Sequence, residues 1–135
     1  MKQLEHTEQA SLIKWWALAH NAFGVPESCL FAIPNGGERN IVVAAKLKSE
    51  GVRAGIPDLF LAVPVNGWNG LFIEMKKKKG GRLSDNQRTM MSIFSAYKYS
   101  VAVCHGFIEA KRTIETYLRQ GVDNVQINCD GGGCN

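Results

Sequence analysis

Two carboxylates and one ammonium group, on Asp58, Glu74 and Lys76, carry the clearest chemical signal in the sequence. Asp58 opens one apolar, β-rich run, and Glu74 and Lys76 alternate with apolar residues in a second run. The segment between them, 64–70, is rich in Pro, Asn and Gly. Two such runs around a cluster of turn residues predict an antiparallel β-hairpin.

The pairing of the two strands decides whether these polar groups meet. If the loop covers residues 64–70, antiparallel pairing places Phe60 opposite Glu74 and Asp58 opposite Lys76. Residues directly opposite each other point to the same face, so the three polar groups gather at one end of the sheet. A slip of one residue would send Asp58 to the other face. The core side of the second strand is expected to carry Leu71, Ile73 and Met75.

Two carboxylates beside an ammonium group suit a hard divalent cation. Mg²⁺ prefers oxygen ligands in octahedral geometry and keeps several waters, so two carboxylates and a main-chain carbonyl leave positions for a phosphate oxygen and a nucleophilic water. A nearby lysine can hold or deprotonate that water, or offset charge on the phosphate. From the spacing alone, an ordinary solvated surface hairpin explains the same residues.

Hydrophobic periodicity and turn residues place the remaining elements around this hairpin. A stripe through Leu12, Trp16, Ala19 and Phe23 has the period of a helix with one buried face. The expected helices cover 7–23, 40–50, 84–97 and 107–118, and the further strands cover 29–33 and 100–104. The order is therefore α-β-α-β-β-α-β-α, an α/β fold with a mixed β-sheet flanked by helices. The third strand, third helix and fourth strand form a βαβ unit, so those two strands should be parallel.

Two of these helices carry more detailed expectations. The second helix should bury an inner face, and the third should open with a capping box in which Ser84 and Gln87 satisfy each other's backbone N–H groups. The inner face of the second helix is expected to consist of Ile41, Ala44, Ala45 and Leu47.

The composition suits one compact domain. The chain has 135 residues, of which 45% are hydrophobic and 21% charged, and this excludes a disordered tail protein. We expect a domain over residues 1–121 and a loosely packed C-terminal tail over 122–135. No apolar run approaches the ~18 residues of a membrane span, and the N-terminus carries no signal-peptide core. We therefore expect a soluble protein of the cytoplasm, bacterial or that of a host cell if the chain is phage-encoded. The four cysteines lack the paired spacing of a zinc site and are expected to be free thiols.

Positive charge is concentrated directly after the second hairpin strand. The whole chain carries +4, whereas residues 76–88 hold six basic side chains and one acidic one, a net +5. Lysines on a glycine-jointed loop suit phosphate contacts without base specificity, which weaken with salt. A solvated loop is the alternative. The residues expected to contact nucleic acid are Lys77, Lys78, Lys79, Arg82, Arg88, Arg53 and Asn35.

Three further polar residues are less informative. Glu8 lies one turn before Leu12 and should point toward the sheet, although a negative residue in the first turn of a helix also interacts favourably with the helix dipole. Gln87 either serves the capping box with Ser84 or points into the site. His105 follows the last strand, and because no motif places a nucleophile with it, a structural or surface role is expected.

Two segments, Gly55-Ile-Pro-Asp58 and Phe72-Ile-Glu74-Met-Lys76, resemble the split PD-(D/E)XK nuclease motif. With further elements in the same order, the chain resembles the VRR-NUC family, the virus-type replication-repair nucleases, from Glu8 to about Leu118. The matching elements are Glu8 in the opening helix, the turn Pro34-Asn-Gly-Gly37, the run that ends at Asp58, the Glu-x-Lys strand and Gln87 in the next helix. This resemblance implies a restriction-endonuclease-like core.

The resemblance also implies metal-dependent hydrolysis of DNA phosphodiesters. By it, Asp58 and Glu74 would bind Mg²⁺ or Mn²⁺ with the Met75 carbonyl as a further ligand, and Lys76 would serve the attacking water. The catalytic residues that it implies are Asp58, Glu74, Lys76, Gln87 and Glu8, the last acting through a water or another ligand of the metal.

The short, stand-alone members of this family are associated with homodimers that act on branched DNA such as four-way (Holliday) junctions. A two-fold dimer presents two equivalent sites, which suits paired cuts in a symmetric junction. The alternatives are a restriction-like nuclease on linear duplex DNA, a non-catalytic DNA-binding module, and a structural subunit of a replication or recombination complex.

Overall fold

The computed structural model describes residues 2–34 and 41–120. The predictions on Asn35, on the tail 122–135 and on Cys129 and Cys134 lie outside the described residues. The elements in chain order are α1 (Lys2–Ala19), η1 (His20–Phe23), η2 (Glu27–Cys29), β1 (Leu30–Ala32), α2 (Ile41–Ser49), β2 (Leu59–Leu61), β3 (Leu71–Lys76), α3 (Asp85–Ala96), β4 (Ser100–His105) and α4 (Phe107–Arg119).

The strands of the described chain form one mixed sheet in the order β1-β2-β3-β4. The first three are antiparallel neighbours, and β3 and β4 are parallel and joined through α3. The expected βαβ unit is therefore confirmed. Two short 3-10 helices, η1 and η2, stand between α1 and β1 and were not expected.

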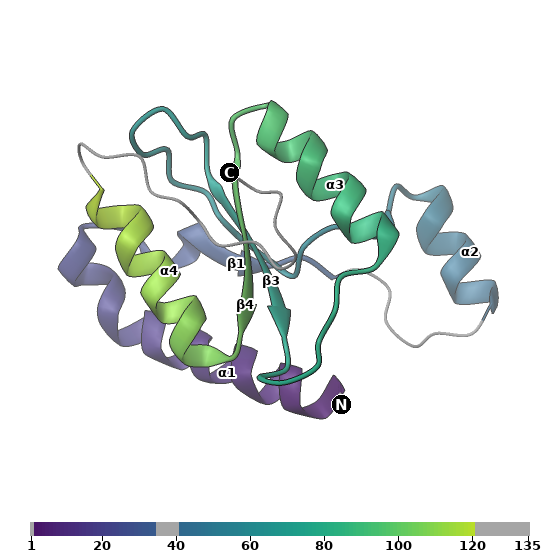
Figure 1. Cartoon of the computed structure of the whole chain (residues 1–135), viewed down its shortest axis with the longest axis horizontal. Coiled ribbons are helices and arrows are strands. Elements are labelled where there is room, and N and C mark those ends of the chain that lie inside the picture. Colours follow the sequence, from purple (N-terminus) through teal and green to yellow (C-terminus); the bar gives the residue numbers. More distant parts are fainter. Residues whose placement is uncertain (1, 35–40, 121–135) are drawn as a thin grey trace.

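Helices cover both faces of the sheet, with α1 and α4 on one side and α3 on the other (Figure 1). On the α3 side, Phe72 stacks on Phe94 with ring centroids 4.3 Å apart. On the other side, β3 has the apolar face that its alternation predicted. The largest buried residues there are Leu12, Trp16, Leu59, Leu61, Leu71, Ile73, Met75, Ile114 and Tyr117. Only the α3 side of β3 is therefore left for its polar residues.

The first helix keeps its predicted stripe but ends differently. Leu12 and Trp16 are buried, and the Trp16 Nε1–H donates to the Glu27 carbonyl at 2.8 Å. The turn predicted to complete the helix is instead the 3-10 helix η1. Gly24, in the left-handed conformation at φ 70°, ends η1, as glycine commonly does after a helix.

The prediction that the second helix buries an inner face is wrong. Ile41 is 86% exposed and Val42 78% exposed, and α2 contains no buried residue. Figure 1 shows α2 standing away from the sheet. Because β1 and β2 are antiparallel neighbours, a short hairpin would suffice to join them, and α2 is not a crossover that must pack on a sheet face.

The predicted hairpin register is wrong by two residues. Leu59 pairs with Ile73, so one further step of antiparallel pairing brings Asp58 opposite Glu74, where the prediction had Lys76. Because side chains alternate with a period of two, this slip leaves every side chain on its predicted face. The three polar groups therefore stay together in spite of the error.

The cause of the slip is a second, smaller turn inside the loop. Val65 and Trp68 exchange two backbone hydrogen bonds of 3.0 and 2.9 Å, around Asn66 at φ 48° and Gly67 at φ 88°. Asn-Gly is the dipeptide that favours such a two-residue turn. Val65 and Trp68 pair with each other inside the loop and do not continue the pairing of β2 with β3. The loop between these strands is therefore longer than 64–70.

The two cysteines within the described residues, Cys29 and Cys104, are free thiols, as expected. Cys104 lies in β4 under α4, where burial raises the pKa of its thiol to about 12. A neutral, buried thiol of this kind is a structural residue.

Candidate active site

Asp58 lies directly before β2 and opposite Glu74 of β3. Its Oδ2 accepts a hydrogen bond of 2.8 Å from the backbone N–H of Met75. Its backbone carbonyl accepts another of 2.8 Å from the N–H of Ile33, and the preceding Pro57 is buried. The position of Asp58 is thus fixed by its side-chain bond to Met75, its backbone bond to Ile33 and the buried Pro57 before it.

Gly55 brings the approach to Asp58 close to the first turn of α3. It has φ 87°, and a Cβ there would lie 2.5 Å from the Asn86 carbonyl oxygen. Only glycine fits both the left-handed backbone and the short distance. Because Asn86 precedes Gln87, this contact brings Gln87 to the strand end that carries Asp58.

Glu74 is a buried carboxylate on the α3 side of the sheet, 4% exposed. Its Oε2 accepts a hydrogen bond of 2.9 Å from Gln87 Nε2 and lies 3.6 Å from Lys76 Nζ. A charge removed from water to this extent needs such partners, since burial without them is costly. Both partners are residues that the sequence placed in the site.

Gln87 fills the two roles that the sequence left as alternatives. The capping box is present: the Ser84 hydroxyl accepts from the Gln87 N–H at 3.1 Å, and Gln87 Oε1 accepts from the Ser84 N–H at 2.8 Å. The same side chain then donates through Nε2 to Glu74. A side-chain amide has an acceptor and a donor at its two ends, so the helix cap orients the group that holds Glu74.

The structure therefore brings four predicted site residues together, namely Asp58, Glu74, Lys76 and Gln87. In the described part of the chain, no group of three or more His, Cys, Asp and Glu side chains has a metal-binding arrangement. The acidic donors at this strand end are a pair of carboxylates on neighbouring strands, with the backbone of Met75 between them.

Glu8, on α1, extends its side chain to the start of α4. Its Oε1 accepts a hydrogen bond of 2.7 Å from the Phe107 N–H and lies 3.9 Å from Lys78 Nζ. The side chain points to the end of the sheet, as expected from the stripe. There it satisfies one of the open backbone N–H groups of α4, an interaction that favours a negative charge.

The lysine-rich loop, residues 77–82, leaves β3 at this same strand end and leads to α3. Its side chains reach solvent, with Lys78 70% exposed, and Lys79 and Arg82 are also exposed. Arg88 on α3 and Arg53 before Asp58 are exposed as well. The positive side chains predicted to contact phosphates thus lie on the segments next to the carboxylate pair, namely the loop after β3, the first turn of α3 and the approach to Asp58. Asn35 lies outside the described residues.

His105 lies beside the lysine-rich loop, although the sequence predicted only a structural or surface role for it. His105 pairs with Lys76 in the parallel register of β3 and β4, and its Nδ1 lies 3.0 Å from the Lys77 carbonyl oxygen. The sequence predicts that β3 and β4 are parallel but not how they are aligned, and it is this alignment that places His105 beside Lys76.

Comparison with known proteins identifies the family of this chain. The model of the VRR-NUC domain matches residues 5–108. This chain belongs to the VRR-NUC domain family. A solved structure described as a VRR_NUC domain protein is similar to it, with a TM-score of 0.76 and 23% sequence identity over 90% of this chain and 97% of that chain. No curated protein matches it.

For a VRR-NUC domain, the function is of the nuclease type, with DNA as the substrate. The mixed four-stranded sheet with flanking helices agrees with the fold of the similar VRR_NUC structure. Within the described residues, no helix combines the length and the apolar character that a membrane crossing requires.

Proposed function

We propose that this VRR-NUC domain is a metal-dependent DNA endonuclease that hydrolyses phosphodiester bonds at Asp58, Glu74 and Lys76. One observation carries the proposal. The Asp58 carboxylate is hydrogen-bonded to the backbone N–H of Met75, which holds it beside the buried carboxylate of Glu74. Two carboxylates fixed on neighbouring strands form an oxygen donor set that needs little rearrangement to bind a cation.

The chemistry of these donors suits Mg²⁺ or Mn²⁺. Asp58, Glu74 and the Met75 carbonyl would supply hard oxygen ligands, the type that these ions prefer over imidazole or thiolate. A bound divalent ion would polarise the phosphate and lower the pKa of a bound water.

The neighbouring side chains would act on the water and on Glu74. The Lys76 ammonium, 3.6 Å from Glu74 Oε2, would hold the attacking water by a hydrogen bond and offset negative charge that develops on the phosphate. Gln87 would keep Glu74 in one orientation, since its Nε2–H is bound to the carboxylate. The exposed loop 77–82 would bind the DNA backbone, and such binding weakens steeply with salt.

We further propose that the chain acts as a homodimer on branched DNA such as four-way junctions. The resemblance suggests this assembly, and α2 supports it. An isolated helix shorter than ~12 residues is marginal in water, yet α2 has nine residues and exposes Ile41 and Val42 almost fully. A second copy of the chain that covered these two residues would stabilise α2.

Cleavage assays on four-way junctions, flaps and linear duplexes test the reaction. With Mg²⁺ or Mn²⁺ we expect preferential cutting of the junction, and none in EDTA. Asp58→Asn and Glu74→Gln should abolish cutting, and Lys76→Ala should slow it by about 10²–10⁴. Glu115→Gln, a carboxylate removed from the outer helix α4, should cut like the wild type. Undiminished cutting by Asp58→Asn would contradict the assigned site.

The same panel separates the alternatives. Equal cutting of duplex and junction would indicate a restriction-like nuclease, and metal-independent binding without products would indicate a DNA-binding module. Analytical ultracentrifugation tests the dimer: Ile41→Asp should convert dimers to monomers without unfolding the domain. A monomeric wild type at assay concentrations would contradict the dimer.

A further inference from the structure

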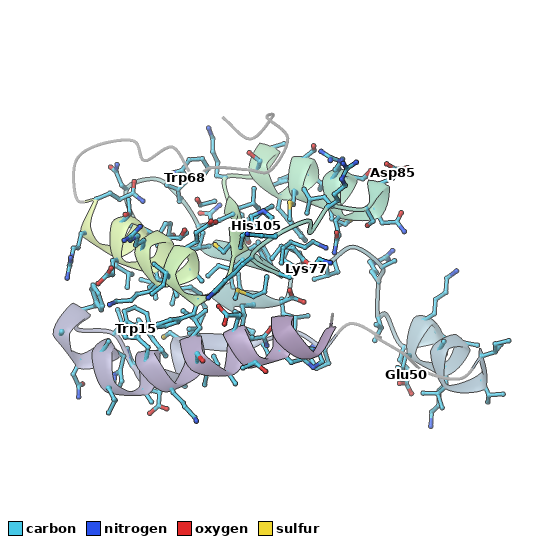
Figure 2. The ribbon with its side chains drawn as sticks, turned by 60° about the horizontal axis from the view of Figure 1, so that its bottom comes forward. Trp15, Glu50, Trp68, Lys77, Asp85 and His105 are labelled. Atoms are coloured by element: carbon cyan, nitrogen blue, oxygen red, sulfur yellow. The ribbon has the colours of Figure 1, made fainter. Side chains whose placement is uncertain are left out.

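The turn between β4 and α4, formed by His105, Gly106 and Phe107, lies against the lysine-rich loop. The His105 ring contacts the loop directly, because its Nδ1 is 3.0 Å from the Lys77 carbonyl oxygen. Figure 2 labels both residues in the middle of the molecule, between α1 and α3, and far from Glu50 at the end of α2. The sequence assigned no role in the site to this turn.

The partner atom fixes the chemistry of the His105 contact. A carbonyl oxygen only accepts hydrogen bonds, so Nδ1 carries the proton and donates it to Lys77. The ring thus anchors the Lys77 carbonyl.

His105 is itself held from two directions. Its backbone N–H donates to Glu109 Oε1 at 2.9 Å, and its strand pairs in register with β3, where Lys76 is its neighbour. Val103, two residues earlier, packs with Phe72 on the α3 side, so His105 lies on the side of the sheet that carries Glu74. An anchor on this side adjoins the proposed site.

The next residues of the turn, together with Glu8, contact Lys78. Gly106 has φ 100°, and a Cβ there would lie 2.8 Å from Glu8 Oε1 and 3.0 Å from Lys78 Cγ. The Glu8 carboxylate then joins the Phe107 N–H at 2.7 Å and Lys78 Nζ at 3.9 Å. The first two lysines of the loop therefore contact one turn.

We propose that His105 is a positioning residue for DNA binding, which fixes the start of the lysine-rich loop by holding the Lys77 carbonyl. The inference rests on the proposed function in that the loop is taken to bind the DNA backbone. A loop already ordered in the free protein loses less conformational entropy when it binds. His105 thereby strengthens binding by Lys77 and Lys78 without touching DNA.

The test compares two substitutions of His105 in the full chain. Asparagine places an amide N–H where the histidine Nδ1–H stands, whereas alanine has no donor. We expect His105→Ala to raise the Kd for a junction about three- to tenfold, consistent with the loss of one hydrogen bond. It should raise KM by a similar factor with kcat nearly unchanged, and His105→Asn should restore most of the affinity.

Two controls separate this inference from the proposed function. His20 likewise donates through Nδ1 to a backbone carbonyl, that of Val25 at 2.8 Å, but lies on η1, so His20→Ala should leave Kd unchanged. Trypsin cleavage after the loop lysines of the free protein reports loop order without any DNA: His105→Ala should accelerate it and His105→Asn should not. A wild type that binds no DNA would defeat the proposed function alone. His105→Asn as defective as His105→Ala in both measurements would overturn the inference.

Discussion

Gln87 offers the sharpest test of how the candidate site is built, because one side chain serves both the α3 cap and Glu74. Gln87→Met preserves the length of the side chain and removes both side-chain hydrogen bonds. A hydrogen bond to a buried carboxylate contributes about 1.5–3 kcal/mol, and the reciprocal half of a capping box adds roughly 0.5–1 kcal/mol. With Glu74 only 4% exposed, water cannot replace the lost donor, so the expected loss is about 2–4 kcal/mol.

Urea unfolding measures this loss, and Ser84→Ala is its matched control. Ser84→Ala removes only the hydroxyl that caps Gln87 N–H and should cost about 1 kcal/mol. With an m-value of roughly 2 kcal/mol per M, Gln87→Met should lower the midpoint by about 1–2 M and Ser84→Ala by about 0.5 M. Equal midpoints for the two variants would refute the view that Gln87 supports Glu74.

A third variant tests the effect of a second negative charge beside Glu74. Gln87→Glu retains an oxygen for the Ser84 N–H but sets a carboxylate against Glu74, at the position where Nε2 now donates over 2.9 Å. Like charges at this distance disfavour joint ionisation. We therefore expect strong destabilisation at pH 7 that shrinks toward pH 4, where the pair shares a proton. The Gln87→Met deficit should shrink less over the same range, because that variant adds no second carboxylate.

Three further outcomes follow from contacts of the fold. Glu8→Gln retains the acceptor for the Phe107 N–H and should cost little stability, whereas Glu8→Ala should cost about 1 kcal/mol in urea unfolding; if cleavage fails in Glu8→Gln with stability intact, Glu8 serves the reaction as well. Gly55→Ala should lower the thermal midpoint and the cleavage rate together, because its Cβ would meet Asn86 at 2.5 Å; an unchanged midpoint would contradict that packing. Burial raises the pKa of the Cys104 thiol from 9.0 to about 12, so between these values the unfolded chain binds fewer protons and stability falls as pH rises. Cys104→Ala should flatten that decline in unfolding curves from pH 8 to 10.5; an identical slope would contradict it.

The sequence predicted which side chains come together better than it predicted the register of the hairpin. The alternation in β3 alone assigns Glu74 and Lys76 to one face and the apolar residues Leu71, Ile73 and Met75 to the other. The contacts confirm this, since Glu74 is bonded to Gln87 of α3 and the apolar residues lie in the core on the other side. The register depended on loop length, which the Asn66-Gly67 turn altered. A two-residue error preserves faces, so Asp58 stayed with Glu74; a one-residue error would have separated them.

Other features depend on contacts between distant segments, which no local pattern contains. Gln87 was given two competing roles because a sequence pattern does not show that the two ends of one amide face different partners. His105 acquires its place only when β4 is aligned with β3. The α2 prediction failed for a different reason: its apolar residues have helical spacing, but periodicity does not say whether a sheet face is available to cover them.

The hydrogen bond between the Ile33 N–H and the Asp58 carbonyl, at 2.8 Å, has a topological consequence. It joins the two ends of the segment that leaves the sheet after β1, contains α2 and returns to the sheet at β2. The pairing of β1 with β2 continues up to this hydrogen bond, so the part of the segment around α2 can change in length and sequence while the strands stay paired. Its last residues cannot, because Gly55 packs against Asn86 and Pro57 is buried. Since Ile33 and Asp58 join the two ends of this segment, a ligand or partner that displaces α2 acts on the sheet at these two residues, one of which carries a carboxylate of the candidate site.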